Sequence, residues 1–262
     1  MSIRRGLTSA IGFRLFFLYL FTVLGGCGGD GSGAVDTAAN KIVIVLLDRS
    51  GSVRDDRAIY DRALSVVRRS LREGDRFVMG SITSASGTDF SASIDYVLPL
   101  PLKKQSWLDE PIKYRREKEE HEKQLAETLA DLDREIQMLM QTSSDTARTT
   151  ICESLGVVEP IFHSERRRKI LVILSDMVED SGVANFDRRF LSLEEIRGII
   201  EHQRAAGTLP DLAGVRIYVA GALASPPERS AAIKRFWTEY FAAAGAILGN
   251  GNYGRVLGPF EE

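Results

Sequence analysis

The sequence predicts an α/β fold in which a doubly wound, mostly parallel sheet is flanked by helices. Residues 42–47 and 170–174 are unbroken runs of aliphatic residues. Unbroken rather than alternating hydrophobicity is typical of strands covered on both faces, as in a parallel sheet. Segments with helical spacing lie between such runs, which indicates repeated βαβ units. A chain of 262 residues, 44% of them hydrophobic, is long and apolar enough for one such domain with additional segments.

The individual elements follow from the same two patterns. Residues 56–71 have helical spacing, because Ile59, Ala63 and Val67 fall on one side. The Gly-Asn-Gly-Asn sequence at residues 249–252 is typical of a turn. Along the whole chain, we predict strands at residues 42–47, 76–82, 94–98, 170–174, 215–220 and 253–257, and helices at residues 56–71, 193–204 and 231–244.

Residues 103–142 interrupt this alternation as a charged helical insertion. We expect one helix over residues 111–141, with Pro111 in its first turn, where proline is well tolerated. Its apolar residues form a narrow stripe at spacings of four and three: Leu125, Leu129, Leu132, Ile136 and Leu139. Such a helix would be ~45 Å long against ~17–20 Å for a strand, so part of it must project or fold back. It is either a solvated surface helix with one docked face or a coiled-coil arm for a partner or a second copy.

The N-terminal residues 1–26 have the layout of a secretory signal peptide. Three arginines precede an apolar run at residues 15–24, which is too short for a comfortable membrane span of ~20 residues. The motif Leu24-Gly25-Gly26-Cys27 resembles a bacterial lipobox. That resemblance implies cleavage before Cys27 and a lipid on its thiol. The alternative is an uncleaved anchor helix, and both interpretations place the folded part outside the cytoplasm.

Residues 27–40 are interpreted as the lipidated cysteine and a flexible tether, because they are rich in Gly, Ala and Asp. Gly28 rather than aspartate follows the cysteine, and by the same resemblance an outer-membrane anchor facing the periplasm is favoured. Cys152 then has no partner in the chain, and we expect a small buried side chain there. The formal net charge of -2 shows no basic bias, so no nucleic-acid partner is expected.

Polar residues follow two of the predicted strands. Asp48-Arg49-Ser50-Gly51-Ser52 comes directly after residues 42–47, and Ser175-Asp176 comes directly after residues 170–174. Ligands of doubly wound sheets bind beyond the carboxyl ends of the strands. Carboxylate and hydroxyl oxygens suit Mg²⁺, Mn²⁺ or Ca²⁺ rather than zinc. The polar loop 142–150 adds threonines at a helix start, where threonine is also a natural cap.

The segment Asp48-Arg49-Ser50-Gly51-Ser52 resembles the DxSxS signature of the metal-ion-dependent adhesion site in von Willebrand factor type A (VWA) domains. Thr149 precedes Leu155 by six residues, as the family's threonine precedes its Ala-Leu pair, although Thr150 is another possible register. Asp176 matches the family's aspartate after a hydrophobic strand. The chain departs from the family at Ser154, which replaces the alanine, and at Met177, which replaces the usual glycine. The resemblance implies a Rossmann-like VWA domain over residues 41–258, interrupted by the insertion.

The resemblance also implies a function. In the family pattern Ser50, Ser52 and Thr149 would contact the metal directly, while Asp48 and Asp176 would act mainly through waters. The cation would be Mg²⁺ first, with Mn²⁺ or Ca²⁺ as alternatives, and its open position would take a carboxylate from a protein partner. We therefore expect a metal-dependent adhesion or scaffold domain on a lipid-anchored envelope protein, with no catalytic residues.

Three other interpretations stay open at the sequence level. Ser50 and Ser52 could cap the following helix while Asp48 makes local turn hydrogen bonds. The chain could be a metal-independent adaptor that acts through the charged helix. It could also be a magnesium-dependent phosphohydrolase, because an aspartate after the first strand is similar to that of haloacid dehalogenase-type enzymes. Those enzymes need a second aspartate where this chain has Ser50. The chain's three histidines fall in predicted helices and give no support for a catalytic triad: His121, His163 and His202.

Overall fold

The computed structural model describes residues 40–50, 57–82, 93–103, 110–142, 149–186, 190–222 and 224–260. The chain divides into two compact units, Met1–Ala34 and Val35–Glu262, and the fold below belongs to the second. The predicted signal peptide, the lipidation site Cys27, the tether up to residue 39 and the site residue Ser52 lie outside the described residues. Within the described part of the chain, no helix is long and apolar enough to cross a membrane.

The described residues form one six-stranded sheet in the order β3-β2-β1-β4-β5-β6. Every neighbouring pair is parallel except β2 with β3, which is antiparallel. The predicted mostly parallel α/β architecture is therefore confirmed. The strands are β1 (Lys41–Asp48), β2 (Arg76–Ile82), β3 (Ile94–Val97), β4 (Arg168–Leu174), β5 (Arg216–Ala220) and β6 (Ile247–Gly254).

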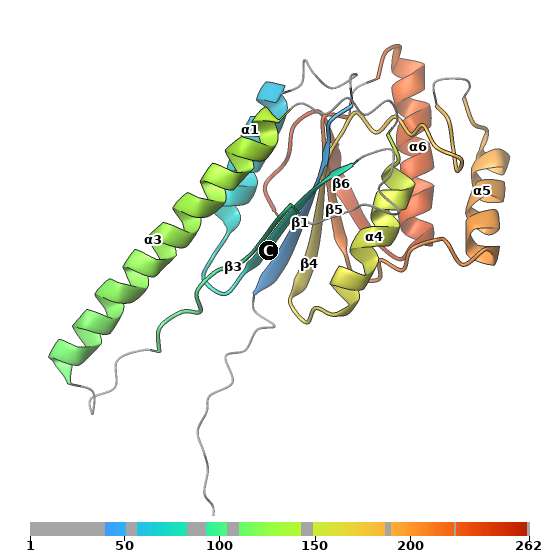
Figure 1. Ribbon diagram of the computed structural model, residues 1–262. Coiled ribbons are helices and arrows are strands. Elements are labelled where there is room, and N and C mark those ends of the chain that lie inside the picture. The colour runs from blue at the N-terminus through green and yellow to red at the C-terminus, as the bar shows by residue number, and fades with distance from the viewer. Residues whose placement is uncertain are drawn as a thin grey trace, which may run out of the picture. The chain divides into compact units, whose positions relative to one another are not determined.

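Helices cover both faces of the sheet (Figure 1). Alternate residues of β1 point to opposite faces, so that Val43 and Val45 pack with one helical layer while Ile42 and Ile44 pack with the other. All eight residues of β1 are buried, which explains why its hydrophobicity is unbroken. The first layer contains α1 (Arg57–Ser70) and α3 (Pro111–Gln141), and the second contains α4 (Ile151–His163), α5 (Leu193–Ala205) and α6 (Pro227–Ala243).

The buried side chains of helix α3 all lie in its second half. Its buried residues are Leu132 and Ile136, and most side chains of its first ten residues are exposed. Nε2 of His121 lies 2.8 Å from Oε1 of Glu73, which is in the loop before β2. Residues 111–120 therefore extend ~15 Å further, past the amino-terminal end of β2. The predicted bounds of this helix are confirmed, and its docked half fits the interpretation of a surface helix with one packed face.

The C-terminal strand was predicted in the wrong place. We expected a turn at residues 249–252 and a strand at residues 253–257, whereas β6 runs from Ile247 to Gly254 and includes that turn sequence. The backbone N–H of Ile247 donates to the carbonyl of Val215, at 2.8 Å, and starts the pairing with β5. β6 lies at the sheet edge with a register shift against β5, a position that tolerates glycine and asparagine. Turn-forming residues therefore did not mark a turn here.

Candidate metal-binding site at the carboxyl end of the sheet

The candidate site begins where two neighbouring parallel strands end. β1 pairs with β4 so that Leu47 lies opposite Leu174, and the next residues, Asp48 and Ser175, leave the sheet side by side. The hydroxyl of Ser175 donates a 2.7 Å hydrogen bond to Oδ2 of Asp48. Residues 127 positions apart in the chain are therefore joined directly at the sheet edge.

Asp48 is almost completely buried, with 2% of its surface exposed. Its Oδ1 accepts a 2.9 Å hydrogen bond from the backbone N–H of Ser50, which closes a tight turn at the start of the motif. Burial raises the pKa of the Asp48 carboxyl, and the hydrogen bonds from Ser50 and Ser175 oppose that rise. A buried carboxylate of this kind is stabilised in its charged form by a nearby cation.

Asp176 follows Ser175 and is also buried. Its Oδ1 accepts from the backbone N–H of Val178, at 2.9 Å. Met177, between them, has a φ of 66°, in the left-handed region that favours glycine. Its N–H donates to Oγ of Ser175 and its carbonyl accepts from Nε1 of Trp237, both at 2.9 Å. Met177 therefore adopts a strained backbone conformation that glycine takes more readily.

Thr149 lies just before α4 and is buried. Its carbonyl accepts from the backbone N–H of Asp180, at 2.9 Å, which holds the loop after β4 against the start of α4. Thr150 is the residue at the N-cap, but its side chain makes no capping hydrogen bond. Instead, Oε2 of Glu179 accepts from the N–H groups of Ile151 and Cys152, at 2.8 and 3.2 Å.

Sequence reasoning missed Glu179. Its side chain is fully buried, and burial raises its pKa to about 8, so the carboxyl is largely protonated at neutral pH. The sequence gives no signal for this role, because Glu179 lies in the irregular segment between β4 and α5. Cys152 beside it is buried as expected, and burial raises the pKa of its thiol well above the usual value. Ser175 was also missed as a partner of Asp48.

Four of the five predicted metal ligands are described, and all four are buried at this edge: Asp48, Ser50, Thr149 and Asp176. Among the described residues, no group of three or more His, Cys, Asp or Glu side chains could hold a metal ion. A cation bound here would depend on hydroxyl oxygens together with the two carboxylates. This all-oxygen donor set fits Mg²⁺, Mn²⁺ or Ca²⁺.

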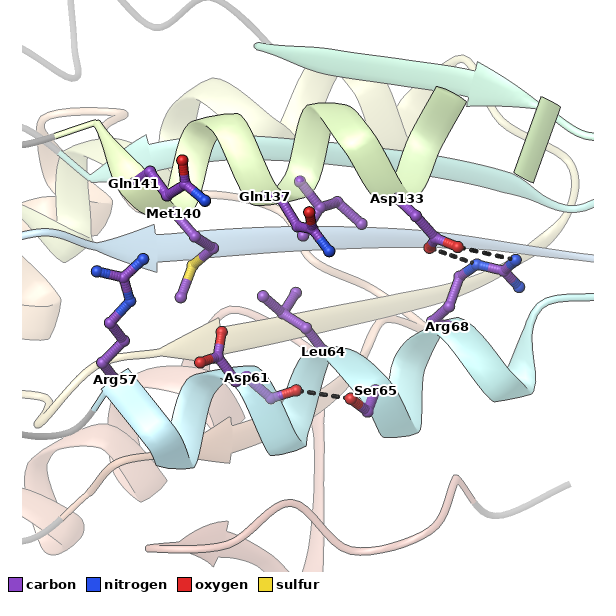
Figure 2. A pocket seen from close by; sticks show the side chains of 10 residues that line it. Arg57, Asp61, Leu64, Ser65, Arg68, Asp133, Gln137, Met140 and Gln141 are labelled. Carbon is purple, nitrogen blue, oxygen red and sulfur yellow. Dashed lines mark hydrogen bonds and ion pairs between the residues drawn. The ribbon is translucent and has the colours of Figure 1, made fainter. Parts of the chain in front are cut away.

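A groove of about 460 Å³ separates α1 from α3 (Figure 2). Leu64, Ile136 and Met140 line it with apolar atoms. An ion pair also lines it, with Nε of Arg68 lying 2.8 Å from Oδ1 of Asp133. The groove is therefore a mixed polar and apolar channel between the two helices of this layer.

Arg49, the second residue of the motif, links the site to α3. Its guanidinium donates to the carbonyl of Thr142, at the C-terminal end of α3. It also lies 3.5 Å from Oγ of Ser81 in β2. A positive charge at the C-terminal end of a helix interacts favourably with the helix dipole. The charged insertion is thus connected to the motif loop at one end and projects past the opposite end of the sheet at the other.

No family model and no curated protein matches the sequence. Several solved structures are similar to this chain: proximal thread matrix protein 1 from the mussel byssus has 12% identity and a TM-score of 0.40, over 80% of this chain and 46% of that one. A von Willebrand factor type A protein from Catenulispora acidiphila has 12% identity and a TM-score of 0.37, over 79% and 43%. The ArnB paralog VWA2 from Sulfolobus acidocaldarius has 13% identity and a TM-score of 0.33, over 70% and 34%. This chain spans less than half of each of these structures.

Proposed function

We propose that this domain binds one divalent cation through Asp48, Ser50, Ser52, Thr149 and Asp176, and uses it to bind a carboxylate of a protein partner. Mg²⁺ is the first choice, with Mn²⁺ and Ca²⁺ as alternatives. The observation that carries the proposal is the convergence of buried Asp48 and Asp176 at one sheet edge, where Ser175 bonds to Asp48.

The two carboxylates favour a cation electrostatically. Unit charges 4 Å apart interact by ~4 kcal/mol at an effective dielectric near 20, so two ionised carboxylates in one site repel strongly. A bound cation would attract both carboxylates and so offset their mutual repulsion. It would also favour the ionised form of Asp48, whose pKa is raised by burial in the absence of a cation.

The chain's own residues would orient the ligands. Ser175 and the Ser50 N–H fix both oxygens of Asp48, and the turn at Met177 fixes Asp176. Neutral hydroxyls in direct contact would leave the cation strongly electrophilic, so that an open coordination position attracts an anionic oxygen. The carboxylates held around them would orient the waters and hydroxyls, as outer ligands do in metal sites generally. No catalytic residue is assigned.

Metal titration is the direct test. Calorimetric titration of Mg²⁺ and Mn²⁺ into the full chain in detergent should show one site, and metal at about one hundred times its dissociation constant should stabilise the fold by ~2.7 kcal/mol. Asp48→Ala should abolish both effects. Asp211→Ala, at an exposed aspartate outside the site, is the matched control and should leave both unchanged. Absence of binding by the wild-type chain at millimolar metal would refute the proposal.

We further propose that the domain is displayed on the bacterial envelope by a lipid on Cys27, with the outer membrane favoured. The support is the lipobox-like sequence and the preceding basic and apolar segments. Cys27→Ser should leave an unlipidated precursor of higher mass and release the protein from membranes. Unchanged mass and unchanged membrane retention of that variant would contradict the anchor.

A second candidate function is the binding of a partner by α3 without a metal ion. It is favoured by the exposure of the first ten residues of that helix beyond its docked half. Partner capture from envelope extract distinguishes the two. Capture that survives chelator and Asp48→Ala but is lost when residues 112–118 are deleted would favour the helix over the metal site.

A further inference from the structure

The two ends of the sheet differ in charge. The acidic residues Asp48 and Asp176 lie at the carboxyl ends of β1 and β4. At the opposite end the chain enters β4 through the basic run Arg166-Arg167-Arg168-Lys169. Because Lys41 lies opposite Arg168 in the parallel pair of β1 and β4, the chain also enters β1 at this basic end.

Part of this positive charge is neutralised inside the domain, through three ion pairs: Lys41–Asp75 at 2.5 Å, Arg76–Asp95 at 2.7 Å and Arg167–Glu165 at 2.9 Å. The side chains of Arg166, Arg168 and Lys169 have no hydrogen bond or ion pair within the described ranges. Arg166 and Arg168 are exposed. Their charges are therefore available to an anionic surface outside the domain.

Helix α3 brings two more arginines to the same end. The contact between His121 and Glu73 fixes the helix at the level of the loop before β2, and residues 111–120 continue past it (Figure 1). Arg115 and Arg116 are exposed in this projecting part. Glu110 lies at the N-cap, and the other acidic residues of this part come after the two arginines, nearer the sheet: Glu117, Glu119 and Glu120. We define the basic end as Arg115, Arg116, Arg166, Arg168 and Lys169.

We propose that the basic end contacts anionic phospholipid headgroups of the membrane that holds the chain, so that the candidate metal site faces away from that membrane. This inference rests on the proposed lipid anchor at Cys27. The segment from Cys27 to Asn40 can span at most about 45 Å even when fully extended, and it joins the domain at the basic end. Tethered basic residues are thereby kept near the headgroups, and their attraction acts within a Debye length of about 10 Å.

A membrane fits these charges better than a nucleic acid does. The whole chain has a formal net charge of -2, whereas nucleic-acid-binding domains usually carry a strong basic excess. The anchor segment joins the domain at the basic end, so the membrane lipid is held close to these residues. RNA or DNA is not held there.

Chemical modification of arginine in the full chain tests this orientation. The chain is reconstituted in vesicles of phosphatidylcholine alone or of phosphatidylcholine with phosphatidylglycerol, treated with phenylglyoxal and analysed by mass spectrometry. Arg115, Arg116, Arg166 and Arg168 should react several-fold more slowly in the anionic vesicles. This protection should disappear near 1 M salt, where the Debye length is about 3 Å. Equal reaction rates in the two kinds of vesicle would overturn the inference.

Internal and designed controls are available in the same chain. Arg197 on α5 and Arg235 on α6 are exposed and should react equally in both vesicles. Combining Arg166→Glu with Arg168→Glu should weaken the protection of the α3 arginines several-fold, while Arg197→Glu with Arg235→Glu should not. Equal effects of the two double substitutions would count against the basic end. Equal protection by single-stranded RNA without vesicles would overturn the choice of lipid.

Flotation separates failure of the anchor from failure of the orientation. Wild-type chain purified from bacterial membranes should float with both kinds of vesicle because its lipid inserts irrespective of headgroup charge. If it floats with both but its arginines react equally, the anchor stands and the orientation is wrong. If it fails to float with phosphatidylcholine vesicles, the anchor is wrong and the orientation falls with it. Metal binding in detergent is independent of both outcomes.

Discussion

The hydroxyl of Ser175 donates a 2.7 Å hydrogen bond to Oδ2 of Asp48, and this contact joins the ends of β1 and β4 at the candidate metal site. Both residues are buried, with 0% and 2% of their surfaces exposed, so water cannot replace the bond easily. The contact therefore fixes the orientation of the Asp48 carboxyl group toward any bound cation.

We expect Ser175→Ala to destabilise the fold by about 1–3 kcal/mol, because it leaves a buried carboxylate oxygen without its donor. In an Asp48→Asn background the same substitution should cost less, because the carboxylate is gone. Urea unfolding of the four proteins gives this coupling energy directly. Equal costs in the two backgrounds would mean that the Ser175–Asp48 bond does not contribute.

Glu179 should make stability depend on pH. Its pKa rises from 4.5 to about 8 in the folded protein, so the folded state holds a proton that the unfolded state releases between these values. Folding stability should therefore fall as the pH rises from about 5 to about 8, by an amount on the order of a few kcal/mol. Burial also raises the pKa of Asp48, so Asp48 should likewise lower the folding stability as the pH rises.

Glu179→Gln isolates the contribution of Glu179. The amide oxygen can still accept from the N–H groups of Ile151 and Cys152, and it does not titrate. The variant should retain its stability at the upper end of this pH range better than wild type, as measured by urea unfolding across the range. Glu194→Gln, at an exposed position on α5, is the control and should keep the wild-type slope. A Glu179→Gln slope equal to that of wild type would show that Glu179 is not the titrating group.

At position 177 a glycine variant should be more stable than an alanine variant, although alanine usually gives the more stable protein. The φ of 66° at Met177 strains any residue with a Cβ, while the Met177 side chain is fully buried. Both Met177→Gly and Met177→Ala lose that packing, at about 2–5 kcal/mol for the alanine variant. Only glycine relieves the backbone, by about 1 kcal/mol. Thermal unfolding should therefore find the glycine variant the more stable of the two, whereas a more stable alanine variant would show that the turn is not strained.

The projecting part of α3, residues 111–120, should be dispensable for folding. Deleting residues 112–118 removes about two exposed turns and should leave a cooperative thermal transition close to that of wild type. Leu132→Ala, in the docked half, should instead cost about 2–5 kcal/mol because Leu132 is fully buried. A deletion that extended to Glu135 would remove Leu132 as well and should therefore destabilise the core. Loss of cooperative unfolding after the short deletion would show that the projecting part also stabilises the core.

Local sequence patterns were sufficient to predict most elements. The unbroken hydrophobicity of β1 and β4 and the helical spacing of α1 and α3 each report burial along a single element. Burial on both faces of a strand, or along one stripe of a helix, is a local property of the residue order. For the same reason the order of Asp48, Ser50, Thr149 and Asp176 along the chain could be matched to a family pattern. Their role in binding metal is still a prediction.

Local patterns failed where pairing between distant segments decides the structure. The edge strand β6 includes a sequence typical of a turn, because its hydrogen bonds to β5 outweigh the local preference of glycine and asparagine. Helix α4 is capped by Glu179 rather than by the adjacent threonines. Neither feature is visible in a local window of sequence.

The sequence by itself determined the α/β class, the bounds of the long charged helix and the loop residues that could supply oxygen ligands. Only the tertiary structure decided which of these groups meet, because the parallel register of β1 and β4 places Ser175 against Asp48 across 127 positions of chain. It also decided that Met177 takes a left-handed turn and that Glu179 is buried with a raised pKa. These properties depend on the dielectric environment and hydrogen-bond partners supplied by distant segments, which exist only once the chain has folded.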